Sequence, residues 1–136
     1  MESPRVALVR QAFAAFAARD VDALREISDP DIEVVTVTGM VAGREEPYRG
    51  FEGLDAYIAD VVAVWDEIEL TPTEFHEVSG DRLLVIGRVR ARRGPNLVDL
   101  PNAWLWEFRD EKVVSARVFG DPRGARLFLD AEAPDA

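Results

Sequence analysis

The feature that most constrains this chain is a change of hydrophobic period near residue 66. Between residues 54 and 65, apolar side chains recur three and four positions apart, which is the spacing of an amphipathic helix. Beyond residue 67, apolar and polar side chains alternate, as they do in strands with one buried face. The alternation runs through four segments, 68–78, 82–92, 96–108 and 112–119. Because the joints SGD, RGP and RDEK are short, we expect antiparallel hairpins.

The N-terminal part of the chain is expected to be helical. Ser3 and Pro4 suit the first positions of a helix, and apolar residues at helical spacing extend it to about residue 19. Asp20 is suited to cap a second helix, which ends at the Asp-Pro pair near residue 29. β-branched residues then predict a strand over 31–38, followed by irregular, glycine-rich backbone as far as residue 53.

The order of these elements predicts an α+β domain. Helices come first and a run of hairpin-linked strands follows, so a curved sheet laid over the long helix buries both apolar faces. The chain has 136 residues, which fits one domain, and we place it at residues 1–129. Asp121-Pro122 is suited to cap a last short helix before a tail at residues 130–136.

Charge and composition exclude several classes of function. The formal net charge of −10 disfavours binding to nucleic acid or to an anionic membrane surface. The chain has no cysteine and one histidine, so cysteine-based zinc sites, thiolate chemistry and multi-histidine metal sites are excluded. No dinucleotide-binding, phosphate-binding or serine-nucleophile motif occurs. We therefore expect no metal and no cofactor. The lack of a long apolar run or a signal segment predicts a cytoplasmic location.

Three stretches resemble a known group of proteins. FAAFAARDVDALREISDPDIEVV, YRGFEGLDAYI and WEFRDEKVVSARVFGD are similar, in this order and spacing, to the SnoaL-like branch of the nuclear transport factor two-like superfamily. The resemblance covers about residues 6–128. It implies a cone, in which a strongly curved antiparallel sheet wraps around a long helix and leaves a deep, mostly apolar pocket at its open end. It also implies a homodimer, which we expect to form through the sheet.

The resemblance says less about activity, because the superfamily includes isomerases, cyclases, hydrolases, dehydratases and non-enzymatic members. Ketosteroid isomerases use a tyrosine and two aspartates, and the corresponding positions here are Ala12, Val35 and Trp104. None of these can carry a proton, so we do not expect that activity. Polyketide cyclases commonly have a histidine or an aspartate near the position of Trp104. Because this chain has a tryptophan there, the resemblance disfavours a cyclase. The turn at 110–112 lacks the family's usual glycine, which predicts a changed turn geometry.

Alternating aromatic residues on the third strand are the main candidates for a binding site. Asn102, Trp104 and Trp106 share one face, which we expect to point inward because Glu107 lies on the other. A buried indole N–H needs an acceptor, so we favour pocket lining over core packing for the two tryptophans. Asn102 is either a polar group near the pocket mouth or a turn residue.

Two further aromatic residues are candidates for ligand contact. The resemblance implies that Tyr48 packs over the pocket. Trp65 lies on the stripe of the long helix, which also floors the cavity, and core packing is its alternative role.

Charged candidates come from two other strands. Glu33 shares a face with Val35 and Val37, and if that face is concave its carboxyl group can act as a general acid or base. Otherwise it is a solvated residue at the start of a strand. Arg88 and Arg90 either form part of an exposed or dimer-facing stripe or bind an anionic group at the pocket mouth, and a one-residue bulge would exchange these faces.

These candidates leave three hypotheses for function. The first is a domain that holds an apolar or aromatic small molecule, with cofactor-free acid/base chemistry by Glu33 if it is an enzyme. The second is a ligand-binding or regulatory module without catalysis. The third is a protein-interaction domain whose pocket is filled by its own side chains, in contrast to the ~300 Å³ or more that is typical of ligand sites.

Overall fold

The computed structural model describes residues 2–78, 81–120 and 123–124. The helices are α1 (Pro4–Ala18), α2 (Val21–Ile27), α3 (Val37–Val41) and α4 (Gly50–Val64). The strands are β1 (Ser28–Val35), β2 (Tyr48–Arg49), β3 (Glu67–Val78), β4 (Arg82–Arg93), β5 (Asn96–Arg109) and β6 (Lys112–Phe119). The residues 125–128 predicted to carry the last helix, and the tail predicted at 130–136, lie outside the described residues.

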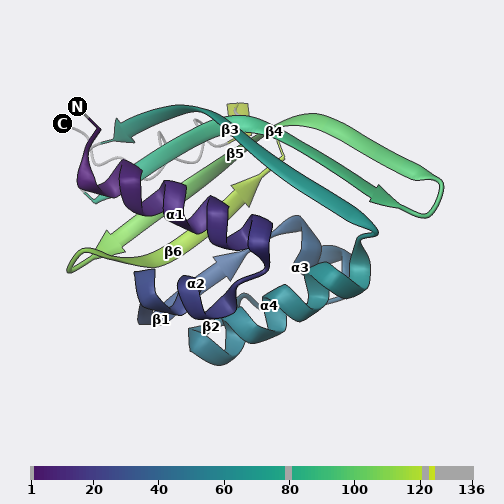
Figure 1. Cartoon of the computed structure of the whole chain (residues 1–136), viewed down its shortest axis with the longest axis horizontal. Coiled ribbons are helices and arrows are strands. Elements are labelled where there is room, and N and C mark those ends of the chain that lie inside the picture. Colours follow the sequence, from purple (N-terminus) through teal and green to yellow (C-terminus); the bar gives the residue numbers. More distant parts are fainter. Residues whose placement is uncertain (1, 79–80, 121–122, 125–136) are drawn as a thin grey trace.

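The strands form one bent sheet in the order β2-β1-β6-β5-β4-β3. Neighbouring strands from β3 to β6 are antiparallel, whereas β1 runs parallel to β6. Figure 1 shows the bend of the sheet and the diagonal course of α1 across it. The predicted α+β class and the succession of four antiparallel strands are confirmed.

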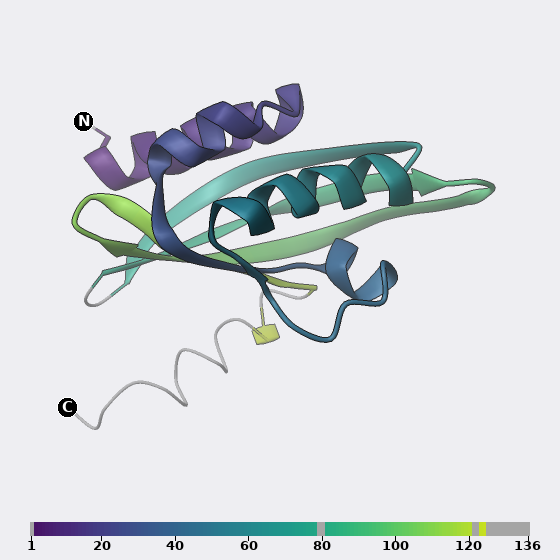
Figure 2. The ribbon, with the colours of Figure 1, turned by 90° about the horizontal axis from the view of Figure 1, so that it is seen from below.

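The helices α1, α2 and α4 lie on the inner side of the bend, as Figure 2 shows from below. Their buried residues and the inner side chains of the sheet form one apolar core. Val9 of α1, Val61 of α4 and Val85 of β4 are almost fully buried in it. Burying a valine side chain contributes roughly 1.5–3 kcal/mol, so this core dominates the stability of the fold. The sheet wrapped around a long helix, implied by the resemblance, is therefore confirmed.

The structure differs from the sequence prediction after β1. The strand ends at Val35 instead of residue 38, because the Thr36 hydroxyl caps α3 by accepting a hydrogen bond from the Gly39 amide at 3.2 Å. The helix α4 starts at Gly50, earlier than predicted. Its buried stripe is also narrower than predicted, since Val62 is 64% exposed.

An extra residue in β3 bends the sheet without disturbing its neighbours. The register between β3 and β4 shifts between Pro72 and Glu74, opposite Gly87. The pairing of β4 with β5 is continuous from Arg82 to Arg93. Side chains on β4 and β5 therefore alternate without interruption, which fixes the faces of all the candidates on these two strands.

The turn between β5 and β6 places two residues other than glycine in a conformation that favours glycine. Asp110 and Glu111 both adopt left-handed backbone, with φ of 50° and 65°. Left-handed backbone costs an ordinary residue roughly 1–2 kcal/mol, part of which glycine avoids. We expect Glu111→Gly to raise the free energy of unfolding by up to about 1 kcal/mol, measured by urea denaturation. Gly94→Ala makes the reverse change, because it removes a glycine from left-handed backbone with a φ of 59°. It serves as the matched control and is expected to be destabilising.

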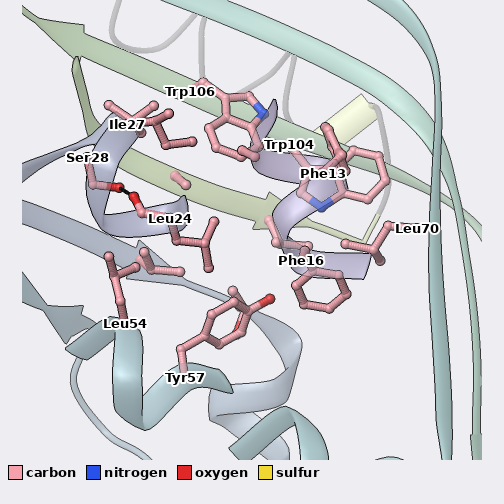
Figure 3. A pocket seen from close by; sticks show the side chains of 16 residues that line it. Phe13, Phe16, Leu24, Ile27, Ser28, Leu54, Tyr57, Leu70, Trp104 and Trp106 are labelled. Carbon is pink, nitrogen blue, oxygen red and sulfur yellow. Dashed lines mark hydrogen bonds between the residues drawn. The ribbon is translucent and has the colours of Figure 1, made fainter. Parts of the chain in front are cut away.

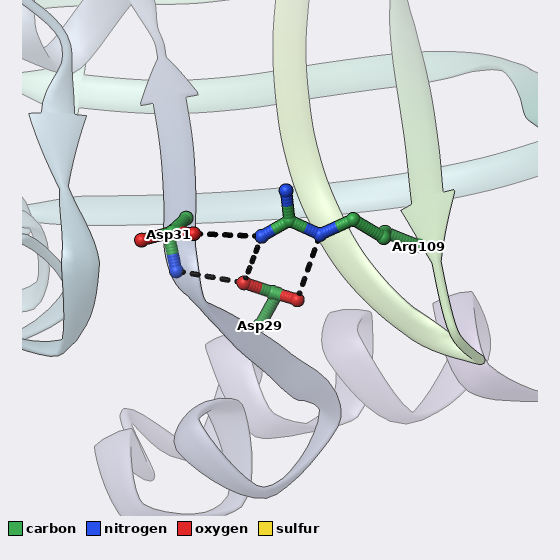
Figure 4. A network of polar contacts seen from close by, with 3 residues as sticks. All are labelled: Asp29, Asp31 and Arg109. Atoms are coloured by element: carbon green, nitrogen blue, oxygen red, sulfur yellow. Dashed lines mark hydrogen bonds and ion pairs between the residues drawn. The ribbon is translucent and has the colours of Figure 1, made fainter.

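A charged network ties the start of β1 to the end of β5 (Figure 4). The Arg109 guanidinium donates to both carboxylate oxygens of Asp29, at 3.2 and 2.7 Å, and to Asp31 at 2.8 Å. The Arg109 side chain, and next the backbone amide of Asp31, hold the pKa of Asp29 below its ordinary value. Bidentate geometry of this kind fixes orientation as well as charge. The network thus joins chain segments 80 positions apart.

The lowered pKa of Asp29 makes the contribution of this network depend on pH. A carboxylate with a depressed pKa stabilises the fold above its ordinary pKa of 3.8, and the effect is lost as pH falls through the lower folded value. We expect Arg109→Gln to lower the melting temperature at pH 7 and to approach the parent protein below about pH 4. Arg49→Gln, which removes an exposed pair with Glu33, is the control and should change little. A deficit that is equal at pH 7 and pH 3 would contradict the assignment.

Candidate ligand site

Two neighbouring hollows lie between the sheet and the helices. The first, the inner hollow, has a volume of about 70 Å³. Its walls come from α1, α2, α4 and the inner faces of β1, β3, β5 and β6 (Figure 3). They comprise Ala12, Phe13, Phe16, Leu24, Ile27, Ser28, Val34, Thr36, Leu54, Tyr57, Leu70, Trp104, Trp106, Val113, Ala116 and Val118. Carbon atoms make up nearly all of this surface, so the inner hollow suits an apolar group.

The second, the outer hollow, has a volume of about 150 Å³ and opens at the rim, where Val37 and Leu100 are exposed. Its lining comprises Thr36, Val37, Thr38, Tyr57, Trp65, Ile68, Leu70, Val89, Ala91, Val98, Leu100, Pro101, Asn102, Trp104, Val118 and Gly120. The two hollows share a waist of five residues: Thr36, Tyr57, Leu70, Trp104 and Val118. Neither hollow reaches the ~300 Å³ typical of ligand sites, but the interior is not filled by side chains.

Edge-to-face contacts between aromatic rings hold the walls of the inner hollow in place. Phe13 on α1 meets Trp104 edge-on with ring centroids 5.1 Å apart and Trp106 at 5.7 Å. Edge-to-face pairs of this kind contribute roughly 0.5–1.5 kcal/mol beyond their buried area. The helix and the central strand therefore fix one another, and the indoles form a rigid wall.

Asn102 and Tyr57 each carry a polar group that borders a hollow without a partner among the described residues. The Asn102 side chain is 4% exposed, lines the outer hollow and makes no hydrogen bond with another described residue. The Tyr57 hydroxyl, which Figure 3 shows directed into the inner hollow, likewise has no such bond. Burial is the main cause that raises the pKa of Tyr57 above its ordinary value, so its phenol stays neutral at physiological pH. A bound molecule with hydrogen-bonding groups would satisfy both.

The other hydroxyls in the lining already have partners. Ser28 donates to the Leu24 carbonyl at 2.6 Å. Thr36 caps α3, and Thr38 accepts a hydrogen bond from the Trp65 indole at 2.9 Å. The Trp106 indole N–H is buried with no hydrogen-bond partner among the residues that the structure describes, at a cost of roughly 1–3 kcal/mol. The Trp106 N–H is therefore an unpaired donor beside the inner hollow.

Glu33 does not belong to either hollow. Ile32 and Val34 are buried, whereas the Glu33 side chain is 47% exposed and pairs with Arg49 at 3.3 Å. The face of β1 that carries Glu33 and Val35 is thus the outer one, and the condition for a buried proton carrier is not met. The residue lies instead in a shallow surface depression beside Pro30 and Gly50.

Arg88 and Arg90 also lie away from both hollows. Because β4 alternates without a bulge, Val89 and Ala91 line the outer hollow and the arginines point to the outer face. Arg88 pairs with Asp99 at 3.0 Å across the sheet. Neither arginine therefore lies at the mouth of the two hollows, and the alternative of an exposed stripe describes their place.

Tyr48 is buried beneath α4 and lines neither hollow. Its hydroxyl donates to Asp60 at 2.7 Å, and the Arg44 guanidinium lies 4.8 Å from the centre of its ring. Desolvation, and next the hydrogen bond to Asp60, raises the pKa of Tyr48 to about 12. The Arg44 side chain holds the pKa of Asp60 below its usual value. Tyr48 therefore anchors the loop before α4 and does not line either hollow, in contrast to its predicted place over the pocket.

Comparison with known proteins agrees with this geometry. A family model described as the SnoaL-like domain matches residues 9–116. The chain belongs to the SnoaL-like domain family. The resemblance seen in the sequence is thus confirmed. No curated protein matches the chain.

Solved structures of similar SnoaL-like shape extend the comparison. TerC, co-crystallised with polyporic acid, is 26% identical, and the match covers 94% of this chain and 99% of TerC with a TM-score of 0.77. An NTF2-like protein of unknown function from Burkholderia pseudomallei is 25% identical, covers 97% of this chain and 100% of its own, and has a TM-score of 0.77. A Mycobacterium tuberculosis protein in complex with estradiol-17beta-hemisuccinate is 13% identical, with coverages of 90% and 97% and a TM-score of 0.71, which shows the fold alone.

The hollows of this SnoaL-like domain are lined by some of the residues predicted from the sequence and by others that were not predicted. Trp65, Asn102, Trp104 and Trp106 surround the hollows, while their contact with a ligand stays a prediction. Tyr57 is an added residue: it lies on the apolar helical stripe between residues 54 and 65, a position typical of core packing. Its hydroxyl lies toward the hollow because the helix stripe faces a bent sheet that does not close fully on it. The same stripe pattern contained the signal, since it already placed Tyr57 beside Leu54 and Ile58.

Proposed function

We propose that this chain binds an apolar, ring-containing small molecule in the two hollows, with Asn102 and Tyr57 as hydrogen-bonding groups. The observation that carries the proposal is the buried, unpartnered side chain of Asn102 at the edge of an apolar space. The Asn102 amide opens onto the outer hollow, so a ligand that displaces solvent from the hollow must bond to the amide in its place. TerC, a relative that was co-crystallised with polyporic acid, supports small-molecule binding.

A calorimetric titration tests the proposal. We would titrate the full chain with polyporic acid, estradiol-17beta-hemisuccinate and 4-alkylphenols, and expect saturable binding by at least one compound. Asn102→Leu keeps a similar shape and removes the amide, so it should weaken binding by roughly twofold to tenfold. Asn96→Leu, the same change at an exposed position of β5, is the matched control. Absence of binding by every compound, or equal affinity in both variants, would refute the proposal.

The two tyrosines allow a second test with opposite expected outcomes. Tyr57→Phe removes an unpartnered hydroxyl, so it should weaken ligand binding and leave the melting temperature nearly unchanged. Tyr48→Phe removes a hydroxyl bonded to Asp60, so it should lower the free energy of unfolding by about 1 kcal/mol and leave affinity unchanged. Calorimetric titration measures the ligand affinity of both variants, and urea denaturation measures their free energy of unfolding. A ligand whose affinity depends on Tyr48 alone would place the site elsewhere.

Binding without turnover is the form of this function that the described lining supports. Tyr57 is the one ionisable side chain among the described residues that line the two hollows, and its phenol stays protonated. Glu33, the proton carrier of the enzymatic hypothesis, lies on the other face of β1. Mass spectrometry of ligand recovered after incubation tests this point, and a chemically altered compound would favour catalysis.

Homodimerisation through the sheet remains part of the proposal. Support for the dimer comes from the resemblance to the family, because the apolar cluster of Leu84 and Ala103 on the outer face is already buried within the single chain. No helix in the described part of the chain is long and apolar enough to cross a membrane. Light scattering on the purified chain decides the oligomeric state, and a monomer at all concentrations would remove the dimer from the proposal.

A further inference from the structure

The volumes of the two hollows limit the size of the ligand, and this limit rests on the proposed function. The outer hollow measures about 150 Å³ and the inner hollow about 70 Å³. An apolar cavity of roughly 150 Å³ in another protein accommodates one benzene molecule. The outer hollow therefore has room for one six-membered ring, and the inner hollow for a group about half that size. Both volumes fall below the ~300 Å³ that larger organic ligands require.

The waist between the hollows orients such a ligand. Tyr57, Leu70 and Trp104 border both spaces, so a group that passes from one to the other must be slender. Asn102 belongs to the outer hollow alone, near the exposed rim. A polar substituent can therefore bond to Asn102 at the outer end. The inner hollow, whose walls are nearly all carbon apart from the Tyr57 hydroxyl at the waist and the Trp106 indole, then receives an apolar one.

The charge of the lining restricts the ligand further. The described residues that line the two hollows include no carboxylate, guanidinium or ammonium group. The polar groups that remain unpaired are the neutral amide of Asn102, the neutral phenol of Tyr57 and the Trp106 indole N–H. A charged group buried beside them would lose its hydration without gaining a counter-ion.

We infer that the ligand is an uncharged, single-ring aromatic compound with one short alkyl substituent and one hydrogen-bonding group. The ring occupies the outer hollow beside Trp104, with its polar group at Asn102. The alkyl substituent passes Leu70 into the inner hollow. Polycyclic compounds exceed the space on both sides of the waist.

A series of phenols with the same polar group tests the inference by calorimetry. The compounds are phenol, 4-propylphenol and estradiol, with 4-propylbenzoate as the charged counterpart. Each buried methylene increases affinity roughly fourfold, so 4-propylphenol should bind at least about tenfold more tightly than phenol. Estradiol and 4-propylbenzoate should each bind at least about tenfold more weakly than 4-propylphenol.

Enlarging the waist provides a gain-of-function variant. Leu70→Ala removes a side chain that borders both hollows, so it should strengthen estradiol binding relative to 4-propylphenol by about tenfold. Leu97→Ala, at a position that is 59% exposed and lines neither hollow, is the control. Circular dichroism confirms that both variants are folded.

The outcomes separate this inference from the proposed function. Preference for 4-propylphenol in the parent protein, together with a shift toward estradiol in Leu70→Ala, supports the inference. Tighter binding of estradiol or polyporic acid by the parent protein overturns the size limit and leaves the proposed function standing. Tighter binding of 4-propylbenzoate overturns the restriction to uncharged ligands. Absence of binding by every compound overturns the proposed function and the inference together.

Discussion

Replacing Trp104 with alanine is expected to lower the free energy of unfolding by roughly 3–5 kcal/mol. The side chain is 4% exposed, packs edge-on against Phe13 and borders both hollows. Its loss removes buried area and opens a cavity that the neighbouring strands cannot fill. Urea denaturation followed by far-ultraviolet circular dichroism measures the change.

Two control variants separate packing from the aromatic contact in this experiment. Trp104→Phe retains a ring beside Phe13 and should recover more than half of the lost stability. Leu100 also lines the outer hollow but is 54% exposed, so Leu100→Ala should change the free energy of unfolding little. A loss below 1 kcal/mol for Trp104→Ala would show that the tryptophan is not part of the packed wall described above.

Replacing Gly87 with alanine is expected to destabilise the fold by roughly 1–3 kcal/mol or more, although the change adds one methyl group. A Cβ atom at this position would lie 2.1 Å from the Thr71 carbonyl oxygen and 2.9 Å from the Cα atom of Pro72. These are backbone atoms of the bulged part of β3, so they cannot rotate away. The bulge would have to shift and take the neighbouring hydrogen bonds of β3 and β4 with it.

The same substitution at Gly120 is the matched control for this prediction. A Cβ atom there would meet no heavy atom within 4 Å, so Gly120→Ala should leave the melting temperature nearly unchanged. Thermal denaturation of both variants makes the comparison. Equal melting temperatures would mean that β3 and β4 do not approach as closely as the bulge requires.

The sheet could be predicted from the sequence in detail because its signals are local. Four alternating segments joined by short turns fix the antiparallel strands to within about one residue at each end. Glu107 on the opposite face from Trp104 and Trp106 also identified the inner face of β5 correctly. The cap formed by Ser3 and Pro4 likewise marked the start of α1.

The faces of β1 could not be predicted in the same way. Ile32 and Val34 alternate with Glu33 and Val35, so both faces of the strand contain apolar side chains and the pattern does not choose between them. The choice depends on the pairing of β1 with β6, which lies about 80 positions further along the chain and leaves no local signal. The prediction that Glu33 carries a proton depended on which face of β1 points inward, and the sequence does not determine that face.

The arginines and Tyr48 show two other limits of the sequence. The bulge that would have turned Arg88 and Arg90 inward does occur, but in β3 and not in β4, and a period of two cannot show which strand holds it. Tyr48 is held between Gly39 and Gly53, which lie on two different helices. The position of the Tyr48 ring depends on tertiary packing and has no local signal in the sequence. The volumes of the hollows depend on tertiary packing in the same way.

The placement of Trp65, Trp104 and Trp106 has a practical consequence. These are the three tryptophans of the chain, and all of them border the two hollows. The tryptophan fluorescence of the unlabelled protein therefore originates entirely at the candidate site. Displacement of solvent by an occupant should shift the emission maximum, so the protein carries its own optical reporter for fractionating cell extracts in search of the natural ligand.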